Sequence, residues 1–197
     1  MKILMARHGQ SQWQVEGDSA GGDSPLTPTG ESQAHHLGRY LNERETDFAA
    51  MYTSDLQRAH RTAEIVAEHL ELPLNVELDL REFESFDQGW APAPTSIWDT
   101  SPDAALAATY VAYRERVQRV LQRIVAAHPD DATVLLIAHG GTIGVILRLV
   151  IGSDTPRLWA WNAALHAIEW HRPGWGPHWI LHYLNCMEYL PQDLRTG

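Results

Sequence analysis

Arg7, His8 and Gly9 are the residues near the start of the chain whose types and spacing could do chemistry. They follow a short apolar run at residues 3–6, typical of a β-strand, so we expect them where the chain leaves a sheet. Open α/β sheets bind ligands at the carboxyl ends of their strands. Arginine offers donors matched to phosphate, a neutral imidazole offers a nucleophilic nitrogen, and glycine allows close backbone approach. The pattern predicts an anion site beside a nucleophile, although on this fragment alone a buried strand with a polar end is the simpler interpretation.

A second candidate cation, Arg58, follows another short apolar stretch, at residues 49–53. Ser54 and Gln57 then have the spacing of a capping box, which predicts a helix that starts at Ser54. Arg58 would fall in the first turn of that helix, where backbone N–H groups and the helix dipole favour anions. The alternative is that Arg58 is an ordinary surface residue of the helix.

His139 and Gly140 follow a continuous apolar run at residues 133–138, the pattern of a strand buried on both faces. The next segment is apolar on all sides except for Arg148, which predicts a buried helix. Because the carboxyl ends of parallel strands meet at one edge of a sheet, His139 and the start of this helix can converge with Arg7 on one anion. The alternative is that His139 is a hydrogen-bonded histidine of the core.

The order of the expected elements predicts the fold class. Strands are expected at residues 3–6, 49–53, 74–78 and 133–138 and in the late segments NAALHAIEW and HWILHYLN. Helices are expected to begin with Thr27 and Pro28, with Ser54, with Ser101 and Pro102, and after His139. Residues 12–25 are rich in Gly and Asp, which is typical of a loop. The alternation predicts an α/β fold, a three-layer α/β/α sandwich with a mostly parallel central sheet and a mixed edge.

The length of the chain, 197 residues, is enough for one well-buried domain and short for two. We therefore expect a single domain over residues 1–197. Between residues 83 and 105, aromatic, proline and acidic residues are mixed without a clear period. Such a segment is typical of a lid or an insertion that faces the substrate.

Composition and charge exclude several classes of function. The net charge is −10 and Lys and Arg form no cluster, so we expect no nucleic-acid partner. The chain has no apolar stretch as long as a membrane span and no secretory signal pattern, so we expect a cytoplasmic protein without a membrane partner. Cys186 is the single cysteine, which agrees with a reducing compartment. The remaining histidines lack zinc-ligand spacing, so we expect no metal and no cofactor.

Several segments resemble, in order and approximate spacing, those of the histidine phosphatase superfamily, which has a phosphoglycerate-mutase-like fold. They are RHGQSQW, DSPLTPTGESQA, TSDLQRAHRTAEIV, LRE, LLIAHGGTIGVIL and WNAALHAIEW. The resemblance covers almost the whole chain outside residues 83–105 and implies catalysis through a covalent phosphohistidine. The positions that match the family's functional residues are Arg7, His8, Arg58, Glu82 and His139.

The resemblance implies a role for each of these residues that its chemistry supports. His8 attacks phosphorus as a neutral imidazole, because nearby guanidiniums lower the pKa of the ring. Arg7 and Arg58 spread positive charge over the phosphoryl oxygens, and His139 donates to the same oxygens. Glu82 is the expected general acid, which protonates the leaving oxygen and later deprotonates the attacking water.

Two expectations concern phosphate binding and the choice of acid. Gln14 stands where an asparagine often contacts phosphate in the family, and we expect its longer amide and the start of the helix at Gly140 to contribute to phosphate binding. Four other acids stand near Glu82 and compete for its role: Glu77, Asp79, Glu84 and Asp87.

These residues predict a phosphomonoester phosphatase that acts on a small phosphorylated metabolite. The first alternative is a mutase of the phosphoglycerate type, which must hold a substrate carboxylate and exclude water. Residues 83–100 contain no Lys or Arg, which favours water as the phosphoryl acceptor. The second alternative is a non-catalytic domain that binds a phosphate ligand. The exposed edge of the sheet and the many tryptophans would allow a homodimer.

Overall fold

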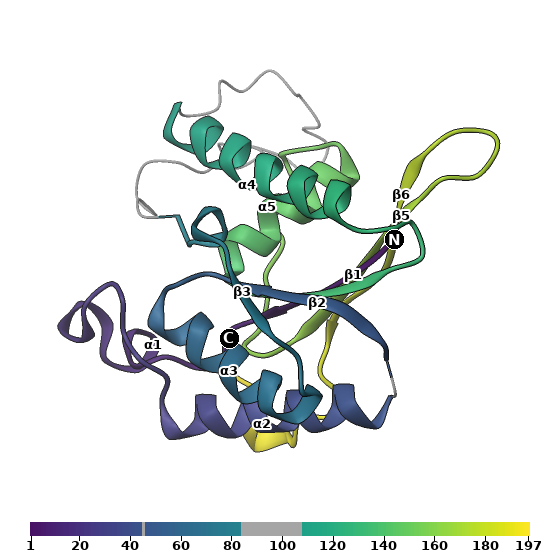
Figure 1. Cartoon of the computed structure of the whole chain (residues 1–197). Helices are drawn as coiled ribbons and strands as arrows, with labels where there is room; N and C mark the ends of the chain where they lie inside the picture. The colour runs from purple at the N-terminus through teal and green to yellow at the C-terminus, as the bar shows by residue number, and fades with distance from the viewer. Residues whose placement is uncertain (45, 84–107) are drawn as a thin grey trace.

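A computed structural model describes residues 1–44, 46–83 and 108–197 (Figure 1). Its strands form one six-stranded sheet in the order β3-β2-β4-β1-β5-β6. The strands are β1 (Lys2–Arg7), β2 (Phe48–Thr53), β3 (Leu74–Val76), β4 (Thr133–Ala138), β5 (Leu165–His171) and β6 (His178–Cys186). The helices are α1 (Gln12–Glu16), α2 (Pro28–Glu43), α3 (Gln57–Leu70), α4 (Ala108–Ala127) and α5 (Gly140–Ile151).

The sheet is parallel except at one edge. β1 pairs in parallel with β4, which pairs in parallel with β2, and β2 pairs in parallel with β3. β5 is antiparallel to β1, and β6 is antiparallel to β5. The predicted α/β fold with a mostly parallel sheet and a mixed edge is therefore confirmed.

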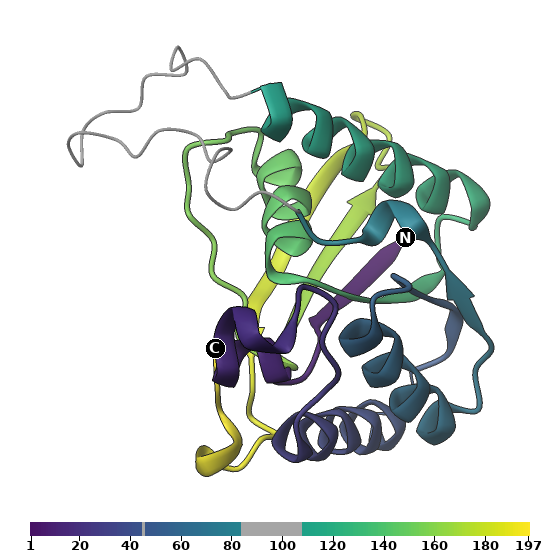
Figure 2. The ribbon, with the colours of Figure 1, turned by 90° about the vertical axis from the view of Figure 1, so that its left-hand side faces the viewer.

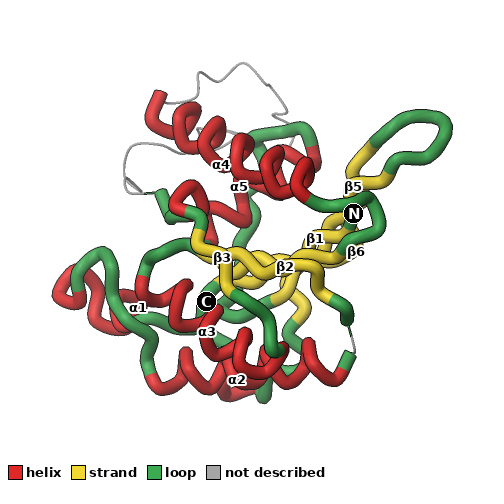
Figure 3. Tube along the Cα trace, viewed as in Figure 1, coloured by secondary structure: helices red, strands yellow, loops and turns green. Residues whose placement is uncertain are grey.

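Helices cover both faces of the sheet. Figure 1 shows α4 and α5 above the strands and α2 and α3 below them, and the same layers appear in Figures 2 and 3. The alternation of side chains along β1 explains both layers: Ile3 and Met5 pack into the core on the α4 and α5 side. Leu4 and Ala6 pack into the second core, with α2 and α3. Residues 3–6 of β1 are buried on both faces, which is why they are all apolar.

The start of α2 follows its local sequence. The Thr27 hydroxyl accepts a hydrogen bond from Gly30 N at 3.0 Å, and Pro28 is the first helical residue, as predicted.

The predicted loop at residues 12–25 is partly wrong, because it contains α1 and a 3₁₀ turn. In α1, Gln14 closes the first turn: its Oε1 accepts from Ser11 N at 3.1 Å, and its own N–H donates to the Ser11 carbonyl at 3.0 Å.

The predicted capping box at Ser54 is wrong. Helix α3 begins at Gln57 after an N-cap at Leu56 that makes no side-chain cap. The Gln57 N–H instead donates to Asp23 Oδ1 at 2.7 Å, so a carboxylate from a distant loop caps the helix. Ser54 Oγ lies 2.7 Å from His139 Nε2, and its hydroxyl therefore serves the site described below.

The insertion predicted at residues 83–105, and the expected helix start at Ser101 and Pro102, lie almost entirely outside the described residues. The described part of α4 carries the predicted apolar stripe, and Tyr110, Tyr113 and Val117 are buried. The late segments form the antiparallel pair β5 and β6, as predicted. Within the described ranges, no helix has the length and apolar character needed to cross a membrane.

Candidate active site

The carboxyl ends of β1 and β4 bring the predicted functional residues together. The two strands pair in parallel with Arg7 opposite Ala138, so His8 and His139 leave the sheet side by side. Their ring centroids are 5.2 Å apart. Arg58, in the first turn of α3, reaches the same point, and its Nε donates to His8 Nε2 at 3.2 Å. The convergence of these residues, predicted from the strand pattern, is present in the structure.

His8 is held as a neutral ring with a defined proton position. Its Nδ1 lies 2.7 Å from the Gly9 carbonyl oxygen, which can only accept, so Nδ1 carries the proton. Its Nε2 then holds a lone pair, which accepts from Arg58. Burial, followed by the charges of Arg7, His139 and Arg58, lowers the pKa of His8 well below 6.5. The ring therefore presents a nucleophilic nitrogen at neutral pH.

Arg58 is buried, which excludes the alternative of an ordinary surface residue. Its NH1 donates to the Gly22 carbonyl at 2.9 Å while its Nε donates to His8. Thr62, one turn later in α3, donates to the Arg58 carbonyl at 2.7 Å and accepts from Gly9 N at 3.1 Å. The helix thus holds the guanidinium and the loop that carries His8 in one arrangement.

Arg7 and His139 each have a buried nitrogen without a hydrogen-bond partner in the part of the chain that the structure describes. Arg7 NH1 donates to the Ala160 carbonyl at 2.8 Å, but its Nε has no hydrogen-bond partner among the described residues. His139 Nδ1 likewise has none within the described ranges. When the Ser54 hydroxyl donates to His139 Nε2, the proton of the neutral ring lies on Nδ1. Buried donors without partners are costly, so both nitrogens are available to bind an anion.

The electrostatics of these residues agree with an anion site. Burial lowers the pKa of Arg7 to about 10, so the guanidinium keeps its charge at neutral pH. Burial, and then Arg58 and Arg7, lowers the pKa of His139 well below 6.5, so that ring is neutral. The fixed positive charge of the arginines and the neutral imidazole donor of His139 together suit the doubly charged phosphate group.

The buried neutral histidines predict a loss of stability in acid. The pKa values of His8 and His139 lie well below 6.5 in the folded protein, and burial lowers that of His166 to about 4. Below pH 6.5 the unfolded chain therefore binds protons that the folded protein does not. We expect the free energy of unfolding to fall with decreasing pH by roughly 1.4 kcal/mol per pH unit for each histidine.

Urea denaturation at a series of pH values from about 7.5 to 4.5 measures this loss across the titration range. Replacing His166 with glutamine removes one of these groups and is expected to reduce the slope. A free energy of unfolding that stays constant as the pH falls below 6.5 would contradict the assignment of neutral buried rings.

Glu82 is the acid that the structure places at the site. Its side chain is buried, and Oε2 accepts from the N–H of Gly141 at 3.0 Å. Its Oε1 accepts from the Tyr113 hydroxyl at 3.0 Å and from Phe83 N at 2.9 Å. Burial lowers the pKa of both Arg7 and Arg58, and the negative charge of Glu82 raises the pKa of each. The carboxylate therefore lies within electrostatic reach of both guanidiniums.

Neighbouring acids that compete with Glu82 in the sequence point elsewhere or lie outside the described residues. Arg123 NH2 lies 2.8 Å from Glu77 Oε2 and 3.1 Å from Asp79 Oδ2 in an exposed ion-pair cluster. Glu84 and Asp87 belong to the part of the chain that is not described. Among the described acids of this stretch, Glu82 alone reaches the site.

Gly141 leaves the space that the Glu82 carboxylate occupies. A Cβ atom on Gly141 would overlap Glu82 Oε1 and crowd the Tyr113 hydroxyl at 3.3 Å. We therefore expect Gly141→Ala to displace the carboxylate and to lower kcat by about 100-fold, because a displacement of this size misaligns an acid-base group. Steady-state hydrolysis of an alkyl phosphate measures the effect.

Gly144→Ala is the matched control for this prediction, because it lies in the same helix. A Cβ on Gly144 would meet its nearest atoms, on Arg148 and Leu158, at 3.6 Å, an ordinary contact. We expect the control to keep wild-type kcat. Equal activity of Gly141→Ala and Gly144→Ala would show that the position of Glu82 does not matter.

Gln14 is close to the site and is held by an asparagine that sequence reasoning missed. Gln14 Nε2 donates to Asn162 Oδ1 at 3.0 Å, and Asn162 Nδ2 donates to Gln14 Oε1 at 3.0 Å. Asn162 Nδ2 also donates to the His8 carbonyl at 3.1 Å. The phosphate contact of Gln14 stays a prediction, since the amide is engaged with Asn162 in this structure. The available signal for Asn162 was a single amide residue three positions before the first residue of β5.

Tyr113 is a second residue whose role was missed. Its position on the apolar stripe of α4 predicted a core residue, and the ring is indeed buried. Its hydroxyl, however, donates to Glu82 and lies 2.8 Å from Thr142 Oγ1. The polar end of a tyrosine on an otherwise apolar stripe was the available signal.

The glycine after His8 serves the protein's own packing. A Cβ on Gly9 would overlap the carbonyl of Gly30 in the first turn of α2. The close backbone approach expected for Gly9 is therefore an approach of helix α2 to the loop that carries His8.

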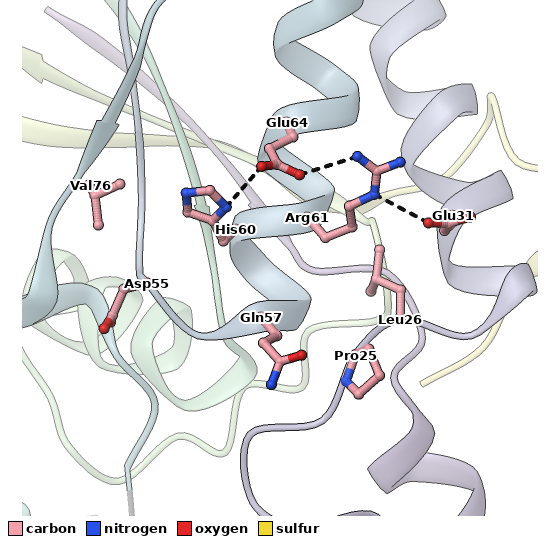
Figure 4. Close-up of a pocket in the computed structure, with 9 residues that line it drawn as sticks. All are labelled: Pro25, Leu26, Glu31, Asp55, Gln57, His60, Arg61, Glu64 and Val76. Carbon is pink, nitrogen blue, oxygen red and sulfur yellow. Dashed lines mark hydrogen bonds and ion pairs between the residues drawn. The ribbon is translucent and has the colours of Figure 1, made fainter.

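A hollow of about 620 Å³ lies between α2, α3 and β3, apart from the predicted functional residues (Figure 4). Its lining consists of Pro25, Leu26, Glu31, Asp55, Gln57, His60, Arg61, Glu64 and Val76. Arg61 pairs with Glu31 and Glu64, each at 3.2 Å, and His60 lies 3.4 Å from Glu64. The charged groups facing this hollow are thus largely paired with one another. In the described part of the chain, no group of three or more His, Cys, Asp or Glu side chains could hold a metal ion.

Comparisons with known proteins agree with this geometry. The chain is 34% identical over 187 residues to PhoE of Bacillus subtilis, an uncharacterized phosphatase, with 88% of this chain and 90% of PhoE covered. It is 27% identical over 215 residues to GpmB of Klebsiella pneumoniae, a probable phosphoglycerate mutase, with 96% and 95% covered. A solved mycobacterial glucosyl-3-phosphoglycerate phosphatase matches with a TM-score of 0.70 at 25% identity, covering 93% of this chain and 98% of that protein.

The pattern of one protein family spans most of the sequence. It matches residues 3–180, which include all five positions for which the resemblance implied a role. The likeness to both phosphatases and mutases places the protein among enzymes of phosphoryl transfer without separating the two reactions. The chain belongs to the histidine phosphatase superfamily, branch 1.

Proposed function

We propose that the protein is a phosphomonoester phosphatase that forms a covalent phosphohistidine on His8. The observation that carries this proposal is the arrangement at Nε2. The Gly9 carbonyl holds the ring proton on Nδ1, and the unpaired nitrogens of Arg7 and His139 lie in the same buried site. A nucleophile beside unsatisfied anion-binding donors is what phosphoryl transfer requires.

In the first step, the lone pair of His8 Nε2 attacks phosphorus and the bond between phosphorus and the ester oxygen breaks. Glu82, in its protonated form, gives its proton to the leaving oxygen. Arg7, Arg58 and His139 bind the phosphoryl oxygens, on which negative charge is concentrated. Gln14 and the backbone N–H of Gly140 are further candidates for phosphate contacts.

In the second step, water attacks the phosphorus atom and the bond between phosphorus and Nε2 breaks. Glu82, now a carboxylate, takes a proton from the attacking water. Inorganic phosphate leaves, and His8 returns to its neutral form. The carboxylate must therefore reach both the leaving oxygen and the water, which agrees with its place near the two guanidiniums.

Hydrolysis is favoured over transfer to a second substrate by the sequence of residues 83–100, which holds no Lys or Arg. A mutase has to retain a carboxylate-bearing intermediate during rephosphorylation, and extra cations over the site would serve that purpose. The likeness to GpmB, a probable phosphoglycerate mutase, keeps the mutase reaction as the second candidate. We infer a small phosphate ester of modest charge as the substrate.

Product analysis separates the two reactions. The protein is incubated with 3-phosphoglycerate and, separately, with a panel of sugar, alkyl and aryl phosphates, in the presence of a chelator. We expect release of inorganic phosphate from members of the panel and no conversion of 3-phosphoglycerate to 2-phosphoglycerate that is faster than hydrolysis. Isomerisation that outpaces phosphate release would replace the phosphatase with the mutase.

A further inference from the structure

Residues 194–196, at the far end of the sequence, lie against the loop that carries His8. Two fully buried amide side chains join them: Gln33 of α2, and Asn162 in the turn before β5. Each of these amides forms hydrogen bonds both to residues 194–196 and to the loop after β1. A buried amide with all its groups paired is an ordering element, because each lost partner leaves an unsatisfied polar atom.

Gln33 connects the segment to the backbone after Gly9. Its Nε2 donates to the Leu194 carbonyl at 2.6 Å and to Thr196 Oγ1 at 2.9 Å. Its Oε1 accepts from Gln10 N at 2.7 Å. The position of the loop on one side of Gly9 is therefore tied to Thr196.

Asn162 makes the corresponding connection on the other side of Gly9. Its backbone N–H donates to the Thr196 carbonyl at 2.9 Å, and its Oδ1 accepts from Thr196 Oγ1 at 3.0 Å. Its Nδ2 donates to the His8 carbonyl at 3.1 Å. The next residue, Ala163, has a φ of 54°, and its N–H donates to the carbonyls of Arg7 at 3.0 Å and His8 at 3.3 Å. A non-glycine residue in this conformation is held there by its surroundings.

Thr196 Oγ1 is the atom at which the two connections meet. It accepts from Gln33 Nε2 and donates to Asn162 Oδ1, so this one hydroxyl joins the two buried amides. Without it each amide loses one hydrogen bond and keeps its others. Between the two anchored points lies the Gly9 carbonyl, which fixes the proton of the His8 ring on Nδ1. A small rotation of that peptide would turn Nε2 away from the phosphorus atom.

We propose that Thr196 is a positioning residue for the phosphoryl transfer step, acting on His8 through Asn162 and Gln33. The inference rests on the proposed phosphohistidine function. The hydroxyl contacts no reacting atom, so its effect is on the alignment of the nucleophile and not on the chemistry of the phosphate.

The test compares Thr196→Val, which keeps the shape of the side chain but removes both hydrogen bonds, with Thr196→Ser, which keeps the hydroxyl. Thr133→Val is the matched control, because Thr133 stands at the opposite end of β4 from His139. For hydrolysis of an aryl phosphate we expect Thr196→Val to lower kcat about tenfold with KM changed less than about twofold, as for the loss of one or two buried hydrogen bonds. Thr196→Ser and Thr133→Val are expected to keep wild-type kcat.

A second readout does not depend on turnover. Nitrogen-15 NMR of the histidine rings reports the proton position and environment of His8. We expect shifted His8 resonances in Thr196→Val and unshifted ones in Thr196→Ser and Thr133→Val. Where valine prevents folding, Thr196→Ala removes the same hydroxyl at a position that is only partly buried.

The outcomes separate the two proposals. Wild-type protein without turnover would refute the proposed function, while the NMR comparison would still decide the role of Thr196. Wild-type activity and unshifted His8 resonances in Thr196→Val would refute the positioning role and leave the phosphatase intact. Equal impairment of the serine and valine variants would assign the effect to packing, and would also refute it.

Discussion

Replacing His8 with alanine is expected to abolish hydrolysis of every phosphomonoester that the wild type accepts, with a loss of kcat on the order of 10⁴-fold or more. In the proposed mechanism His8 alone forms the covalent bond to phosphorus, so its loss removes the first step. His139, the other buried imidazole at the site, remains in the variant, and its Nε2 lies 2.7 Å from the Ser54 hydroxyl. Steady-state release of inorganic phosphate at pH 6, with a chelator present, measures the loss.

The same variant is expected to keep its affinity for phosphate. Arg7, Arg58 and His139 remain in place, and titration calorimetry with inorganic phosphate should give a dissociation constant within about tenfold of the wild type. His178→Ala, in the hairpin of β5 and β6, is the matched control and should retain full turnover. Residual activity of His8→Ala near the wild-type level would remove His8 as nucleophile, and phosphate binding without turnover in the wild type would favour the non-catalytic alternative.

Replacing Glu82 with glutamine is expected to slow hydrolysis by an amount that depends on the leaving group. The leaving group of an alkyl phosphate is a basic alkoxide unless its oxygen is protonated. The first step with this ester should therefore slow by about 10² to 10⁴-fold. The leaving group of a nitrophenyl phosphate is nitrophenolate, a weak base that needs no proton. The rate of phosphoenzyme formation from this ester should therefore change little. The rate of the first step in single-turnover experiments with both esters measures the difference.

The difference between the two esters distinguishes a role of Glu82 in proton transfer from a purely structural role. A disturbed hydrogen-bond network around Gly141 and Tyr113 would slow both esters equally. Glu77→Gln serves as the matched control, because Glu77 pairs with Arg123 in an exposed cluster. Equal slowing of the two esters by Glu82→Gln would contradict the role of general acid.

Much of the fold could be predicted because its signals are local. The continuous apolar run at residues 133–138 is typical of a strand in a sheet that is covered on both faces. Residues 134–138 are indeed buried in β4, as this pattern predicts. The start of α2 is set within one turn, because the Thr27 hydroxyl accepts a hydrogen bond from Gly30 N–H and Pro28 is the first helical residue. Such signals do not depend on the rest of the chain.

The predictions that failed or were incomplete depend on distant partners. Ser54 has the spacing of a capping residue, but its hydroxyl is oriented toward His139, and Asp23 caps α3 in its place. Asn162 and Tyr113 have roles that follow only from the residues across the fold to which they bind. The residues next to Asn162 and Tyr113 in the sequence do not predict those partners.

The site itself was predictable to the extent that its residues leave the strands at one edge. Arg7, His8 and His139 follow β1 and β4, and parallel pairing of neighbouring strands brings such residues together. The family resemblance indicated Glu82 as the acid, but the residue pattern by itself did not separate it from the acids near it. Tertiary structure separates them, because Arg123 holds Glu77 and Asp79 in an exposed cluster while Gly141 N–H binds Glu82.

The central claim is that His8 Nε2 carries the phosphoryl group, and trapping the phosphoenzyme tests it most directly. Wild-type protein is mixed with a ³²P-labelled ester, quenched in alkali within milliseconds, digested and mapped. We expect acid-labile, alkali-stable label, at up to about one phosphoryl group per chain, on the peptide that contains His8, and none in His8→Ala. Multiple turnovers of substrate with no label on that peptide at any quench time would contradict the account.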